Sequence, residues 1–169
     1  IDLKNKNLLK SEKDLTENIM IVDLVRNDLS KIAQKGSVKV SELAQTYTFN
    51  QVHQLISTVE CEIEPNIYFT DILKATFPMG SMTGMPKISM MNYAEEMETF
   101  HRDIYSGTVG YITPEGDFDF NVVIRSLINF PLQNKSYIRA GGAITIDSDP
   151  MKEWEECHLK AQKILQYFE

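Results

Sequence analysis

Two pairs of acidic residues, one near each end of the chain, could bind a metal ion. Asp14 and Glu17 are three residues apart, and so are Glu153 and Glu156. Residues at this spacing share one face of a helix, and two such faces together would offer the oxygen ligands that Mg²⁺ prefers. The alternative is that each pair lies in the exposed first turn of a helix, where acidic residues are common. Spacing alone favours this second interpretation.

A loop rich in glycine and proline, residues 77–87, could bind an anion. It reads Phe-Pro-Met-Gly-Ser-Met-Thr-Gly-Met-Pro-Lys. Its backbone N–H groups, the hydroxyls of Ser81 and Thr83 and the ammonium group of Lys87 are donors, and a helix is expected to begin just after it. The loop lacks the Gly-x-x-x-x-Gly-Lys spacing of a P-loop. A plain connecting turn explains it equally well.

Five further residues could contact a ligand. Gly141 and Gly142 interrupt a strand-like run, which indicates either a bulge or a close approach of the backbone to a ligand. Arg125 has apolar neighbours, so its guanidinium must reach either solvent or a carboxylate. His53 and Tyr105 are by themselves more typical of hydrogen-bonded or packed core residues than of catalysts.

The order of helical and strand-like segments is typical of an α+β fold. Apolar residues recur at three- and four-residue steps from residue 11 to residue 32, which predicts a helix capped by Ser11. We expect further helices over 70–76, 87–97 and 150–168, and strands over 46–62, 104–113, 118–128 and 136–146. Turn-like joints separate the last three strands, which predicts an antiparallel meander.

Composition argues against several classes of protein. The 169 residues carry 17 Lys and Arg against 24 Asp and Glu, a formal net charge of −7. This balance disfavours a nucleic-acid groove, because such grooves are basic. No apolar run approaches the roughly 20 residues of a membrane-spanning helix. Cys61 and Cys157 are too few for a disulfide framework, so a reducing, cytoplasmic compartment is expected.

Several of these segments, taken in their order, resemble the signature motifs of the chorismate-utilising enzymes. The matching segments are 17–29, 52–57, 77–87, 105–107, 124–126, 140–142 and 147–150, followed by Glu153, Glu156 and Lys160. The resemblance covers residues 11–169, which we interpret as the C-terminal part of a single chorismate-binding domain, after a polar lead-in over residues 1–10. Component I of the aminodeoxychorismate synthases is the nearest branch, and component I of the anthranilate synthases is the near relative.

The resemblance implies a fold and a reaction. The fold would be the C-terminal half of the anthranilate synthase-like α+β fold, an antiparallel sheet with flanking helices. The reaction would be Mg²⁺-dependent addition of ammonia at C2 of chorismate with loss of the C4 hydroxyl. Ammonia would come from a glutamine amidotransferase partner. The nearest branch serves folate (4-aminobenzoate) biosynthesis, and the near relative serves tryptophan biosynthesis.

The resemblance also implies which residues would hold the metal ion. Mg²⁺ would lie between Glu17 and Glu156 as its direct ligands. Asp14 and Glu153 would be further ligands or would hold the water molecules of the metal. Lys160 would add a positive charge near the metal and the ring carboxylate of chorismate.

The residues that would contact chorismate follow from the same motifs. Arg125 and Tyr105 would bind the enolpyruvyl carboxylate, and His53 would lie near the hydroxyl that leaves. Hydrogen bonds would come from Thr83 and from the backbone of Gly141, Gly142 and Ala143. Members of the family often have glycine where Ala143 stands, so this chain departs from the pattern there.

One segment that separates the two branches is not among the 169 residues. In the family a Pro-Ile-x-Gly-Thr segment precedes the signature helix, and its middle residue is a lysine in aminodeoxychorismate synthases. We therefore expect the 169 residues alone to be inactive, and to self-associate through exposed apolar faces and strand edges. A non-catalytic domain that binds a small ligand or a metal is the alternative from another class.

Overall fold

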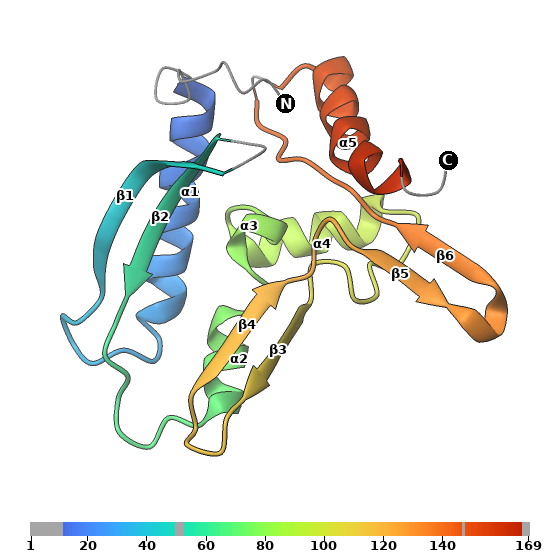
Figure 1. The fold of residues 1–169 in the computed structure, drawn as a ribbon. Helices are drawn as coiled ribbons and strands as arrows, with labels where there is room; N and C mark the ends of the chain where they lie inside the picture. The colour runs from blue at the N-terminus through green and yellow to red at the C-terminus, as the bar shows by residue number, and fades with distance from the viewer. Residues whose placement is uncertain (1–11, 50–52, 147, 167–169) are drawn as a thin grey trace. The chain divides into compact units, whose positions relative to one another are not determined.

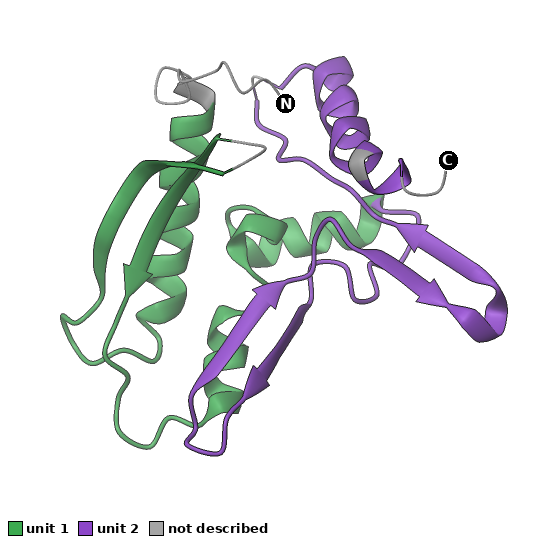
Figure 2. Ribbon diagram, viewed as in Figure 1, with its two compact units in different colours: residues 1–97 green, residues 98–169 purple. Residues whose placement is uncertain are grey.

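The computed structural model describes residues 12–49, 53–146 and 148–166 (Figure 1). The chain divides into two compact units, residues 1–97 and residues 98–169 (Figure 2). Each unit contains helices and small antiparallel sheets of two strands. This composition confirms the predicted α+β class. The single domain expected over residues 11–169 stays a prediction.

Unit 1 is built on a long helix that packs against a β-hairpin (Figure 1). Helix α1 (Glu12–Leu29) contacts strands β1 (Lys39–Thr48) and β2 (His53–Glu60), which pair antiparallel. Their core includes Val22, Leu24, Ala44 and Leu55, all buried. The predicted Ser11 cap lies outside the described residues.

The single strand predicted over residues 46–62 is wrong. The chain reverses between Thr48 and His53, and the first strand of the hairpin begins at Lys39. The stretch from Thr48 to His53 contains neither glycine nor proline, and Asn50 is its single residue of a type that is common in turns. β-Branched and aromatic residues on both sides made two strands look like one.

Three helices complete the described part of unit 1. Helices α2 (Phe69–Thr76) and α4 (Lys87–Met97) confirm the helices predicted over 70–76 and 87–97. The predicted loop between them contains a short helix, α3 (Gly80–Thr83). A Cβ added at Gly80 would lie 2.9 Å from the Cβ of Leu24, so α3 begins in direct contact with α1. Only glycine allows this approach.

Unit 2 contains two separate hairpins. Strand β3 (Thr108–Ile112) pairs with β4 (Phe118–Val122), and β5 (Leu127–Phe130) pairs with β6 (Lys135–Ile138) after a 3₁₀ turn. The meander of three strands is therefore wrong. The predicted run 118–128 breaks because Arg125 adopts a left-handed φ of 49°, which ends an extended strand.

The last helix, α5 (Pro150–Leu165), begins where its sequence predicts. Asp149 is the N-cap, and its side chain accepts hydrogen bonds from the backbone N–H groups of Met151 and Lys152, both at 3.0 Å. Such a cap satisfies donors that the first turn leaves without partners. Its predicted end at Phe168 lies outside the described residues. Among the helices described, none is long and apolar enough to cross a membrane.

Candidate functional site

In unit 2, the side chain of Lys160 connects α5 to the glycine-containing segment that follows β6. Its ammonium group donates a hydrogen bond to the backbone oxygen of Gly141 at 3.0 Å. The same group lies 2.6 Å from Oε1 of Glu156, and the Lys160 side chain is 26% exposed. Partial burial strengthens this attraction relative to a pair in bulk water. Lys160 is thus more than a surface partner for the residue one helical turn before it.

The two carboxylates of α5 face the backbone of Gly142. A Cβ added there would lie 3.3 Å from Oε2 of Glu153 and 3.8 Å from Oε1 of Glu156. Glu153 is buried, with 8% of its surface exposed. Its Oε1 accepts a hydrogen bond from the Ser148 hydroxyl at 2.7 Å, and that hydroxyl accepts one from the backbone N–H of Thr145 at 3.0 Å. A buried carboxylate is thereby held in one orientation.

The oxygen donors of both units have the right chemistry for Mg²⁺. In unit 1, Asp14 and Glu17 lie half-buried on α1; in unit 2, Glu153 and Glu156 lie on α5 beside Gly142. Within residues 12–49, 53–146 and 148–166, no group of three or more His, Cys, Asp or Glu side chains could hold a metal ion. Each pair by itself is still suitable, because Mg²⁺ binds proteins through one or two carboxylates and keeps water molecules.

Tyr105 brings a phenol group to the same glycine segment. Its hydroxyl oxygen would lie 3.0 Å from a Cβ added at Gly141. Burial raises the pKa of Tyr105 further above its ordinary value. The phenol is protonated at neutral pH in any case, so it can donate a hydrogen bond. The backbone N–H of Tyr105 donates to the carbonyl of Arg102 at 2.9 Å, which closes the turn from Arg102 to Tyr105.

A substitution at Gly141 tests this close approach. Gly141→Ala in the full-length protein is expected to lower kcat/KM by about tenfold, because the added methyl group displaces the Tyr105 hydroxyl. Tyr105→Phe removes the hydroxyl, so adding Gly141→Ala to this variant should lower kcat/KM little further. A double-mutant cycle measures this non-additivity. Strictly additive effects would contradict the contact.

The two site residues predicted in the middle of unit 1 make local hydrogen bonds. Nδ1 of His53, at the start of β2, lies 2.9 Å from the hydroxyl oxygen of Thr48. The hydroxyl of Thr83, at the end of α3, lies 3.3 Å from the carbonyl oxygen of Gly84 and 3.4 Å from that of Gly80. Both side chains therefore have positions that their own loop or hairpin sets.

The structure exposes two other predicted residues. Arg125 lies between β4 and β5, and in the part of the chain that the structure describes its guanidinium forms no ion pair. Ala143 is exposed in the segment after β6. Their roles in binding chorismate stay predictions.

Six of the predicted residues are brought together within unit 2: Tyr105, Gly141, Gly142, Glu153, Glu156 and Lys160. Asp14, Glu17, His53 and Thr83 belong to unit 1. One residue that orients a site side chain was missed. Ser148 lies inside the Asp-Ser-Asp-Pro motif, and its position just before the N-cap of α5 was the available signal.

Comparison with known proteins identifies the family. The model of the chorismate binding enzyme family matches residues 2–166. Aminodeoxychorismate synthase component 1 of Klebsiella aerogenes is 40% identical over 99% of this chain, and anthranilate synthase component 1 of Aquifex aeolicus is 38% identical over 97% of it. The chain spans 37% and 33% of the lengths of these two relatives.

A solved structure shares the same fold. The crystal structure of anthranilate synthase component I from Streptococcus pneumoniae superposes with a TM-score of 0.84 at 38% identity, over 92% of this chain and 35% of that one. The resemblance seen in the sequence motifs is thus confirmed over nearly the whole chain. The chain belongs to the chorismate-binding enzyme family.

Proposed function

We propose that these residues are part of an aminodeoxychorismate synthase component I. The reaction would convert chorismate and ammonia to 4-amino-4-deoxychorismate and water, for the synthesis of 4-aminobenzoate and folate. The observation that carries the proposal is the cluster of Tyr105, Lys160 and two glutamates around the Gly141–Gly142 backbone. The identity of 40% to the Klebsiella aerogenes protein supports this branch.

The charges of the cluster suit an anion that carries two carboxylates. Glu153 and Glu156 alone would repel such a molecule, whereas the ammonium group of Lys160 attracts it. We assign Glu17 and Glu156 as ligands of Mg²⁺, and Asp14 and Glu153 as further ligands or holders of its water molecules. When bound, Mg²⁺ would neutralise the ring carboxylate and polarise the reacting allyl system.

The remaining site residues would orient chorismate. Tyr105, whose phenol is protonated at neutral pH, would donate to the enolpyruvyl carboxylate, and Arg125 would pair with the same group. Thr83 and the backbone of residues 141–143 would supply further hydrogen bonds. His53 would lie near the C4 hydroxyl and transfer a proton as it leaves.

Ammonia would come from a glutamine amidotransferase partner, and the protein would act in the cytoplasm. The second candidate function is that of an anthranilate synthase component I. The similarity to the Aquifex aeolicus protein and the TM-score of 0.84 to the Streptococcus pneumoniae structure favour it. Both candidates use chorismate, ammonia and Mg²⁺, and they differ in product.

Consumption of chorismate tests the proposal. The full-length protein, supplied with chorismate, ammonium and Mg²⁺, is expected to consume chorismate, and EDTA should stop the reaction. The 169 residues alone are expected to leave chorismate unchanged, because the Pro-Ile-x-Gly-Thr segment of the family is not among them. Turnover by these residues alone would contradict that expectation. A full-length protein that leaves chorismate unchanged would contradict the proposed function itself.

A further inference from the structure

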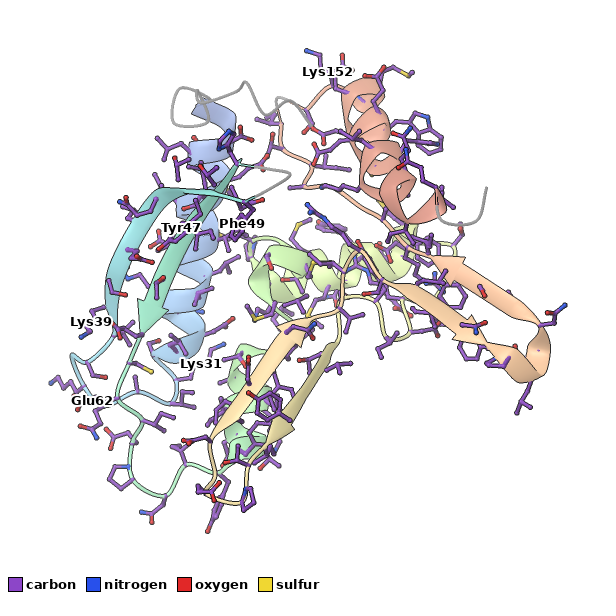
Figure 3. All side chains as sticks on the ribbon, viewed as in Figure 1. Lys31, Lys39, Tyr47, Phe49, Glu62 and Lys152 are labelled. Carbon is purple, nitrogen blue, oxygen red and sulfur yellow. The ribbon has the colours of Figure 1, made fainter. Side chains whose placement is uncertain are left out.

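A buried ion pair connects α1 to the start of α4 in unit 1. Asp28 lies in the last turn of α1, and Lys87 is the first residue of α4. Their side chains form a salt bridge and are 5% and 14% exposed. A second lysine, Lys31, is labelled in Figure 3. It lies 2.8 Å from Oδ1 of the same carboxylate, but its side chain is 51% exposed.

The pair is not explained by the stability of either helix alone. A carboxylate is disfavoured beside the carbonyl groups at the C-terminus of α1, and an ammonium group is disfavoured at the N-terminus of α4. Each charge is therefore unfavourable within its own helix. Burying both adds a further desolvation cost, so the pair is weak evidence for net stability, and a role in specifying geometry is the alternative.

The geometry specified here is that of the segment from α3 to α4. At one end, Gly80 rests against Leu24; at the other, Lys87 binds Asp28. Leu24 and Asp28 are four residues apart, so both contacts fall on the same face of α1. The segment between them contains Thr83, and its turn is closed by a hydrogen bond of 2.9 Å from the N–H of Gly84 to the carbonyl of Gly80.

We propose that Asp28 and Lys87 are positioning residues that hold the segment 80–87 on α1. The helix that carries Asp14 and Glu17 would thereby also set the place of the Thr83 hydroxyl and of the backbone around it. This inference rests on the proposed function, in which Thr83 binds chorismate. Loss of the pair should weaken substrate binding more than it slows the chemical step.

The test compares two lysines that bind the same carboxylate. In the full-length protein, Lys87→Met is expected to raise KM for chorismate about tenfold with kcat changed less than about threefold. Amide hydrogen exchange at residues 82–84 should become about tenfold faster. Lys31→Met removes only the exposed partner and is the matched control, expected to leave KM and exchange unchanged.

A charge swap separates positioning from general instability. In Asp28→Lys/Lys87→Asp, made together with Lys31→Met so that no like charge faces the new lysine, the pair is kept. Each charge now suits its helix end, so KM and exchange should return to within about threefold of the wild-type values. The swap also decides the matter if Lys87→Met does not fold. A folded Lys87→Met protein with unchanged KM, or a swap that restores neither quantity, would overturn the proposal.

Exchange also separates this proposal from the proposed function. A wild-type protein that leaves chorismate unchanged would overturn the function. Faster amide exchange in Lys87→Met would then still support the proposal that the Asp28–Lys87 pair holds the segment 80–87 on α1. Unchanged exchange would overturn that proposal.

Discussion

Glu17→Gln in the full-length protein is expected to lower Mg²⁺-dependent turnover of chorismate by about 10²- to 10³-fold, because it removes a charged ligand of the metal. The substitution keeps the shape of a half-buried side chain on α1, so the melting temperature without Mg²⁺ should stay within about 4 °C. Mg²⁺ should raise the melting temperature of the wild-type protein and have a smaller effect on the variant, since only a bound ion stabilises the folded state.

Asp23→Asn is the matched control for this experiment. Asp23 lies on the same helix, is 60% exposed and pairs with Arg26 at 2.9 Å. Its loss should leave both turnover and the response to Mg²⁺ unchanged, because exposed ion pairs contribute little. Near-normal turnover in Glu17→Gln, or an equal loss in both variants, would reject Glu17 as a metal ligand.

Lys160→Met should produce the second large effect. The variant keeps an apolar stem but loses the ammonium group that binds the Gly141 carbonyl and Glu156. We expect kcat/KM for chorismate to fall by about 10²-fold, since a positive charge placed beside an anionic substrate is removed from a partly buried site. The measurement is initial-rate kinetics at saturating Mg²⁺.

Lys152→Met provides the comparison on the same helix. Lys152 lies near the start of α5, is exposed and points away from the body of unit 2 (Figure 3). Its ammonium group should be dispensable for turnover. A Lys160→Met protein as active as Lys152→Met would show that the contact with Gly141 has no part in the reaction.

The elements with strong local signals could be predicted from the sequence. Helix α5 begins after Asp149 because its carboxylate caps two backbone N–H groups, and α4 begins after Pro86 because proline suits a helix start. The hairpin of β1 and β2 has a weaker signal, since the sequence between the strands lacks glycine and proline and offers Asn50 as its single turn-favouring residue. The break after β4 depends on a positive φ at Arg125. An arginine in a sequence does not indicate such a backbone conformation.

The contacts of the candidate site also differ in how far the sequence predicts them. Glu153, Glu156 and Lys160 are neighbours on one helix, so their spacing alone places them together. The bond from Lys160 to Gly141 joins residues 19 apart, and that from Lys87 to Asp28 joins residues 59 apart. Such contacts depend on how elements pack, and no local pattern reports them. The family motifs include all four residues, but both contacts emerged only from the structure.

The identity of the amination product tests the central claim most directly. The full-length protein is incubated with chorismate, ammonium and Mg²⁺, with and without a lyase that releases 4-aminobenzoate from aminodeoxychorismate. We predict 4-aminobenzoate only when the lyase is present and no fluorescence of anthranilate in either sample. Fluorescent anthranilate formed without the lyase would contradict the aminodeoxychorismate synthase assignment.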